Sequence, residues 1–80
     1  SMIEVGICDG DVAVVECEAR ASPGDIVVAV VDGEYTLETL ESEAGIYVLK
    51  PANIRYETIR PKGRLEIFGV VVGLIRKYRK

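Results

Sequence analysis

An Asp-Gly pair between two apolar runs constrains the fold of this chain more than any other feature of its sequence. Asp32-Gly33 directly follows the run Ile26 to Val31 and leads into Tyr35-Thr36-Leu37. A two-residue Asp-Gly connection favours a tight hairpin, because both turn residues need positive φ. The pair therefore predicts that the two runs are neighbouring antiparallel strands.

Further turn signals divide the rest of the chain into short apolar runs. They are Asp9-Gly10, Pro23-Gly24, Gly45, the segment Lys50-Pro51-Ala52-Asn53 and Pro61-Lys62-Gly63. Twelve Val and eight Ile among 80 residues favour strands, because β-branched side chains are stiff and suit a pleated surface. We therefore predict one all-β domain over residues 1–80, built as a small, coiled, mostly antiparallel sheet of five or six strands.

Two segments allow more than one interpretation. Leu37, Leu40 and the acids around them could form a short helix, although the preceding hairpin turn favours a second strand. In the long final run, Leu65 to Tyr78, Gly69 and Gly73 predict bends or a bulge within a strand. Their spacing also fits a helix-packing motif, but the three valines between them argue for a strand.

Composition excludes several classes of protein. The longest apolar run has six residues, whereas a membrane-spanning helix needs about 20, so no membrane association is expected. Cys8 and Cys17 are interpreted as reduced thiols that pack in the core or near the surface of a cytoplasmic protein. The chain contains no His, so we expect neither a zinc site nor another cofactor.

Charge is distributed unevenly between the two parts of the chain. Residues 1–49 hold eleven acids and one base, whereas residues 50–80 hold two acids and nine bases. The only dense basic cluster is at the end, Arg76, Lys77, Arg79 and Lys80, and it is interpreted as a solvated terminus. We therefore expect no strong nucleic-acid binding. Oppositely charged regions are equally consistent with self-association, in which acidic and basic patches meet across an interface.

Several short motifs occur in a characteristic order. They are Ser1-Met2, Gly6-Ile7-Cys8-Asp9-Gly10-Asp11, Gly24-Asp25-Ile26-Val27-Val28-Ala29, Asp32-Gly33-Glu34-Tyr35-Thr36, Leu49-Lys50-Pro51-Ala52-Asn53 with Tyr56, and Glu66-Ile67-Phe68-Gly69-Val70-Val71-Val72-Gly73. Together they resemble the LexA/UmuD family, more closely UmuD, over essentially the whole chain. The resemblance implies the small coiled antiparallel β-sheet that this family shares with the Ser-Lys signal peptidases.

The resemblance also implies chemistry. Family members cleave their own N-terminal arm with a serine nucleophile and a desolvated, neutral lysine as general base. The family serine corresponds to Ser1, although a native start at Met2 stays an open alternative. The family lysine corresponds to Glu38, two residues past Thr36. A glutamate is a weak base at neutral pH, so this departure predicts impaired catalysis.

The surroundings of Glu38 lead to two further interpretations. The acidic run Glu34, Glu38, Glu41 and Glu43 is interpreted as a solvated face, with Glu38 released from catalysis. A tuned glutamate base is the alternative. Lys50 lies beyond the next turn, and nothing in the sequence directs it toward Ser1.

Three functions follow from the resemblance. The first is a UmuD-like domain of the DNA-damage (SOS) response that forms a homodimer and binds a translesion DNA polymerase or a RecA filament. The second is an active self-cleaving peptidase, and the third is the dimerisation domain of a LexA-like repressor. For the homodimer, we expect Leu65–Val72 at or near the interface.

Overall fold

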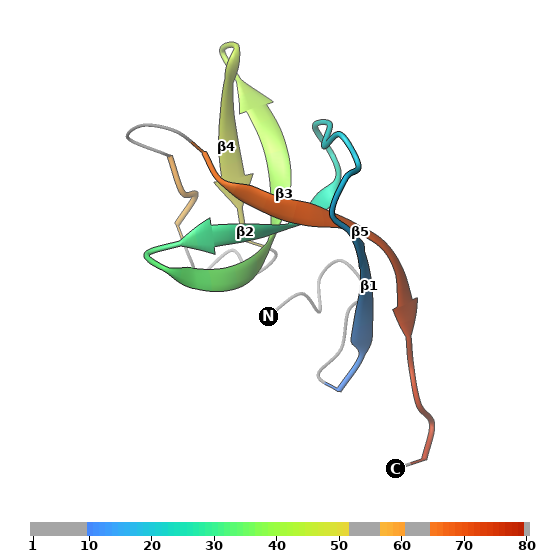
Figure 1. The fold of residues 1–80 in the computed structure, drawn as a ribbon. Coiled ribbons are helices and arrows are strands. Elements are labelled where there is room, and N and C mark those ends of the chain that lie inside the picture. The colour runs from blue at the N-terminus through green and yellow to red at the C-terminus, as the bar shows by residue number, and fades with distance from the viewer. Residues whose placement is uncertain (1–9, 52–56, 61–64, 80) are drawn as a thin grey trace.

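The computed structural model describes residues 10–51, 57–60 and 65–79. These residues form five strands and no helix (Figure 1). The strands are β1 (Val12–Glu16), β2 (Ile26–Val31), β3 (Glu34–Glu43), β4 (Ile46–Lys50) and β5 (Ile67–Ile75). They form one sheet in the order β1-β5-β2-β3-β4, and every neighbouring pair is antiparallel. The predicted all-β antiparallel fold is confirmed.

Two tight hairpins build the β2-β3-β4 part of the sheet. Asp32 and Gly33 connect β2 to β3 with φ values of 51° and 79°, and Ala44 and Gly45 connect β3 to β4 with 52° and 79°. Positive φ at both central residues defines the turn whose twist matches paired strands. The predicted hairpin at Asp32-Gly33 is confirmed. The helical alternative around Leu37 is wrong, because that residue lies within β3 and pairs with Val28.

The turn before β2 also follows from its sequence. Asp25 donates its backbone N–H to the carbonyl of Ser22 at 3.0 Å, with Pro23 and Gly24 between them. Gly24 has a φ of 96°, which the third position of a type II turn requires. The Asp25 carboxylate accepts a hydrogen bond from the N–H of Ser22 at 2.8 Å. This turn aligns β2 with the far end of β3, where Gly24 donates to the carbonyl of Leu40.

The two glycines of β5 lie where its pairing shifts. Val28 pairs with Gly69 but Ala29 pairs with Ile67, and Val14 pairs with Gly73 but Val15 pairs with Val71. β5 therefore carries an extra residue beside each glycine. Such β-bulges bend a strand and increase its twist. The predicted bulge at these glycines is confirmed, and β5 curves across the sheet in Figure 1.

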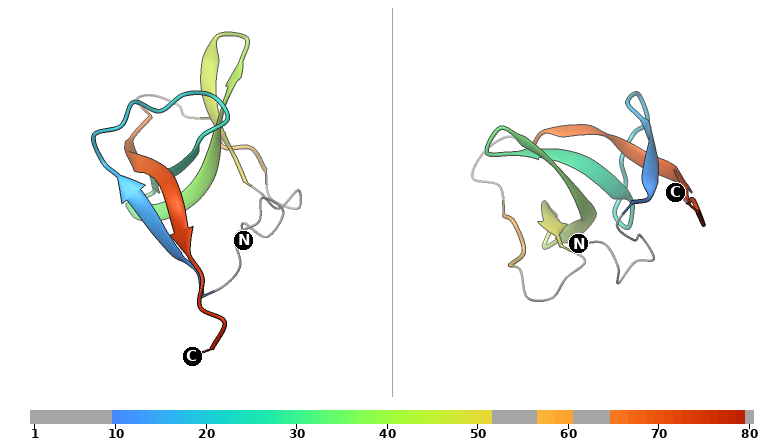
Figure 2. Two further views of the ribbon diagram at one scale, coloured as in Figure 1. Left: turned by 90° about the vertical axis from the view of Figure 1, so that its right-hand side faces the viewer. Right: turned by 90° about the horizontal axis from the view of Figure 1, so that it is seen from below.

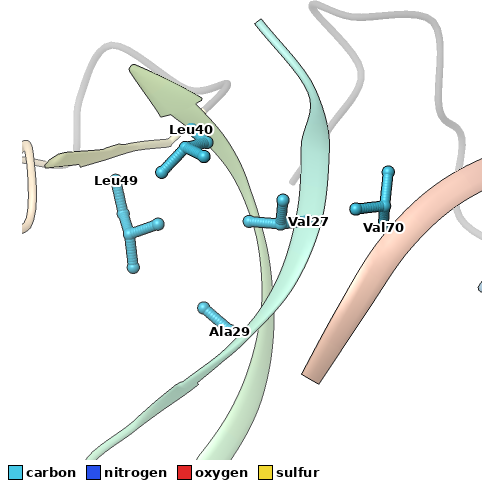
Figure 3. Packing of buried hydrophobic residues seen from close by; sticks show 5 residues of the cluster. All are labelled: Val27, Ala29, Leu40, Leu49 and Val70. Carbon is cyan, nitrogen blue, oxygen red and sulfur yellow. The ribbon is translucent and has the colours of Figure 1, made fainter. Parts of the chain in front are cut away.

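The core is small and lies on one face of the sheet. Its buried apolar side chains converge from four strands in Figure 3: Val27, Ala29, Leu40, Leu49 and Val70. Partly buried side chains pack around them, among them Ile59, whose backbone forms two hydrogen bonds with Leu49. Burial of this cluster fixes which face of β2 and β3 points inward.

The C-terminal part of β5 extends past its pairing with β2, and β1 is its described neighbour there. Figure 2 shows these two segments side by side as a ribbon leading to the C-terminus. Large apolar side chains on this ribbon are exposed: Val12, Val14, Val72, Leu74 and Ile75. Within the described residues, no helix is long and apolar enough to cross a membrane.

Candidate functional site

Glu38 lies on the inward-facing side of β3. Its backbone pairs with Val27, which in turn pairs with Val70 on β5, so the three residues form one row across the sheet. The residue as a whole is 7% exposed, and no other polar or charged residue among the described ones is as buried by this measure. The interpretation of Glu38 as a solvated residue is therefore wrong. The period of two along a strand places it on the same face as Leu40, a core residue.

The environment of this carboxyl group is unfavourable for a charge. Burial raises the pKa of Glu38 above its ordinary value, because desolvation penalises the ionised form. Its Oε2 atom is buried and has no hydrogen-bond partner among the described residues. A buried polar atom without a partner typically costs about 1–3 kcal/mol. The position thus disfavours the negative charge that the sequence places there.

Thr36 adds a second unsatisfied atom to the same face. It lies two residues before Glu38 and pairs with Ala29, which pairs with Ile67. Its Oγ1 atom is also buried, and no partner for it occurs in the part of the chain that the structure describes. The sequence analysis used this threonine only to locate Glu38. The period of two along the predicted strand could have placed both side chains on one face.

The rest of the acidic run behaves differently. Glu43 accepts hydrogen-bonded ion pairs from Lys50 at 3.0 Å and from Arg60 at 2.8 Å. These two cations lower the pKa of Glu43, the hydrogen bond from Lys50 being the largest cause. Glu34 is exposed, as expected for a solvated face. Lys50 therefore has a carboxylate partner in Glu43 and is not paired with Glu38.

Two of the candidate residues lie outside the described residues. These are Ser1, the predicted nucleophile, and Cys8. Cys17 is a free and exposed thiol, so its predicted role in packing is wrong, although a reduced near-surface thiol was expected. Among the described residues, no group of three or more His, Cys, Asp or Glu side chains is arranged to hold a metal ion.

The sequence analysis also missed a connection between the two strands at one end of the β1-β5 ribbon. Arg76 donates from Nε and Nη2 to the two carboxylate oxygens of Asp11 at 2.9 and 2.8 Å. The Asp11 side chain is only 3% exposed. Arg76 is therefore not part of a fully solvated tail. Two parallel bonds fix the orientation of both groups, so this pair holds the start of β1 against the end of β5.

The fold defines an all-β, antiparallel domain of the LexA/S24 type, with the carboxyl group of Glu38 buried on the inward face of its sheet. A family model described as Peptidase S24-like matches residues 1–72. The chain belongs to this family, and the predicted LexA/UmuD resemblance is confirmed.

Three relatives carry the name LexA repressor. The protein from Opitutus terrae is 53% identical over 81 residues, which cover 100% of this chain and 40% of the relative. The one from Acetivibrio thermocellus is 47% identical over 96% of this chain and 36% of its own length. The one from Carboxydothermus hydrogenoformans is 45% identical over 98% of this chain and 39% of its own length. The chain thus spans about two fifths of the length of these relatives.

The burial of Glu38 leads to a prediction about stability and pH. Its raised pKa means that the folded state binds the proton more tightly than the unfolded state. Below the unfolded pKa the carboxyl group is protonated in both states, so it does not reduce the free energy of unfolding. As the pH rises toward and through the folded pKa, ionisation lowers the free energy of unfolding. We expect the free energy of unfolding of Glu38→Gln to increase relative to that of the unmodified chain between pH 4 and pH 8, by about 1.4 kcal/mol for each unit by which the folded pKa of Glu38 exceeds the unfolded one.

Urea unfolding followed by circular dichroism at each pH measures this difference. Glu34→Gln is the matched control, because it removes the same charge from an exposed position on the same strand. Its pH dependence should parallel that of the unmodified chain. A pH-independent difference between Glu38→Gln and the unmodified chain would contradict the expected proton linkage.

Proposed function

We propose that this chain is a LexA/UmuD-type domain of the DNA-damage (SOS) response that forms a homodimer, binds a protein partner and is impaired in self-cleavage. Membership of the Peptidase S24-like family and relatives named LexA repressor support this proposal. The observation that carries the catalytic part is Glu38, a buried carboxyl group at the position that corresponds to the family lysine.

The chemistry of the carboxyl group explains the impairment. A neutral lysine amine is a strong base once burial has lowered its pKa toward neutrality. A carboxylate is intrinsically a far weaker base than an amine. Glu38 also has no proton to lose at alkaline pH, where the lysine would gain activity.

A cleavage assay tests this part of the proposal. The protein is prepared with its natural sequence before Ser1 and incubated between pH 6 and pH 10, and mass spectrometry follows its products. We expect no self-cleavage, and none of a family-type arm peptide added in trans. Efficient cleavage that requires Ser1 would contradict impaired catalysis and make Glu38 the base to study.

The exposed apolar side chains of the β1-β5 ribbon support the homodimer. Val72 is 57% exposed and lies within the predicted interface segment. We expect sedimentation to detect dimers at micromolar concentration, and Val72→Asp to raise the dimer dissociation constant at least about tenfold. Ile46→Asp is the control, because Ile46 is 63% exposed on β4, away from the ribbon. Monomers alone at high micromolar concentration would contradict the proposal.

Two versions of this function differ in what the domain binds or is joined to. A UmuD-like domain binds a translesion polymerase or a RecA filament in the cytoplasm, whereas a LexA-like repressor joins this domain to a DNA-binding domain. The names of the three relatives favour the second version. The genomic reading frame before Ser1 distinguishes them: a helix-turn-helix segment indicates a repressor, and a short arm alone indicates the UmuD type.

A further inference from the structure

The β1-β5 ribbon has no connecting turn at the end where β1 begins and β5 finishes. Val12 and Ile75 pair across the ribbon there, although they lie far apart in the sequence. The pairing of β2 with β5 reaches only as far as Val70, so β1 is the described neighbour of β5 beyond that point. A two-stranded ribbon is at best marginally stable by itself, and strand ends open first. The geometry of this end therefore depends on contacts other than the strand ladder.

The pair formed by Asp11 and Arg76 lies at this end of the ribbon. Asp11 directly precedes β1 and Arg76 directly follows β5, so the pair joins the two segments one residue beyond Val12 and Ile75. Arg76 donates one hydrogen bond to each carboxylate oxygen of Asp11, at 2.9 and 2.8 Å. Two parallel bonds constrain the angle between the groups as well as their distance. The pair thus occupies the place that a turn has in a hairpin.

The burial of Asp11 makes this contact more consequential than a surface ion pair. Its side chain is almost completely buried, whereas that of Arg76 is half exposed. An ion pair between two exposed side chains contributes little, because water screens both charges. A buried carboxylate that loses its cation, in contrast, keeps its desolvation penalty without the compensating attraction. Loss of the Arg76 guanidinium should therefore allow the end of the ribbon to open.

Exposed apolar side chains lie next to this pair. Val12 and Ile75 are directly opposite each other, so their side chains project from the same face of the ribbon, and the period of two places Val14 on that face as well. All three are exposed. A surface of this kind binds more tightly when it is already ordered, because ordering side chains and backbone on association costs free energy.

We propose that the Asp11–Arg76 pair is a clamp that holds the β1-β5 ribbon in the geometry in which it binds a second copy of this chain. The inference rests on the homodimer proposed above and adds the residues that preset its interface. Asp11 and Arg76 act through the ribbon and need not touch the second copy. With the clamp open, dimer formation has to order the apolar side chains of Val12, Val14 and Ile75 first.

The dimer dissociation constant of three variants, measured by sedimentation of the full chain, tests the proposal. Arg76→Gln should raise this constant at least about tenfold, because the interface is no longer preset. Arg76→Lys keeps the charge but not the two parallel bonds, so we expect an increase of about threefold or more. Lys77→Gln is the matched control: it removes one positive charge from the next residue, which is exposed, and should change the constant by less than about twofold.

Hydrogen–deuterium exchange followed by mass spectrometry, at concentrations below the dimer dissociation constant, shows whether the effect is local. In Arg76→Gln the backbone amides of β1 should exchange at least about tenfold faster than in the unmodified chain, while those of β2 and β3 should be unchanged. Faster exchange throughout the sheet would mean that Arg76 stabilises the whole fold, and the proposal of a local clamp would be wrong.

The sedimentation results separate failure of the clamp from failure of the homodimer. If the unmodified chain forms dimers and Arg76→Gln has the same dissociation constant, the clamp alone is refuted. Equal weakening by Arg76→Gln and Lys77→Gln would refute it too, because net charge would then be the cause. If the unmodified chain is monomeric at high micromolar concentration, the homodimer is refuted and the clamp with it.

Discussion

Replacing Glu38 with lysine should produce self-cleavage, which we propose to be impaired in this chain. The site that raises the pKa of a carboxyl group by desolvation should lower the pKa of an amine, which is what a lysine base requires. A positioned general base contributes roughly 10²–10⁴-fold to the rate. We therefore expect measurable cleavage by Glu38→Lys, increasing with pH as the amine loses its proton, in the protein that carries its natural sequence before Ser1.

Three variants identify the source of this activity. Ser1→Ala in the Glu38→Lys background should abolish cleavage, because the nucleophile is then missing. Glu38→Gln should stay inactive, and Glu34→Lys should too, because its lysine would be exposed. If Glu38→Lys folds normally and yields no product at any pH, the assignment of the base position to residue 38 is wrong.

Gly69→Ala should destabilise the fold by about 1–3 kcal/mol or more, the usual penalty for overpacking. A Cβ atom on Gly69 would lie 2.5 Å from Val15 Cγ1 and 2.9 Å from the carbonyl oxygen of Glu16. The valine side chain has some freedom to move, but the carbonyl belongs to the β1 backbone. We therefore expect β1 to separate partly from β5. For a domain of about this size, 1 kcal/mol corresponds to roughly 4–8 °C in Tm.

Gly73→Ala is the matched control for this substitution. A Cβ atom there would meet only Val14 Cβ, at 4.0 Å, which is ordinary van der Waals contact. Calorimetry of both variants should show a Tm for Gly73→Ala within a few degrees of the unmodified chain and a much lower one for Gly69→Ala. Equal effects would indicate that strand propensity, and not contact with β1, determines the need for glycine.

Local signals predicted the strands well because their turns have strict backbone requirements. Asp32-Gly33 needs positive φ at both positions, and the structure has it at both. The glycines of β5 likewise indicated its bulges. The sequence could not show that Gly69 is crowded by β1 while Gly73 has room for a side chain, because β1 is distant in sequence. The pairing of Asp11 with Arg76 is absent from any local pattern, since 65 residues separate them. Only the strand order brings these two residues together.

The error at Glu38 has a different origin. The sequence analysis grouped the acids of residues 34–43 by their charge, although the strand was correctly expected there. Alternation from Leu40 would have placed Glu38 and Thr36 on the inward face, whatever their polarity. The residue type was misleading because a charged side chain is seldom buried without a partner. Such a conflict between pattern and chemistry tends to occur at functional positions.

The place of β5 in the sheet has a consequence for how the chain is synthesised and folds. This strand is the last of the five in sequence, yet it lies between β1 and β2. A nascent chain that has emerged only as far as β4 can form the local β2-β3-β4 meander, but β1 has no described neighbour until β5 arrives. Closing a contact over so many residues is slow compared with forming a hairpin. We infer that β1 waits for its described partner until Ile67–Ile75 has been synthesised, and that a ribosome stalled shortly before Ile67 would leave that strand accessible to chaperones and proteases.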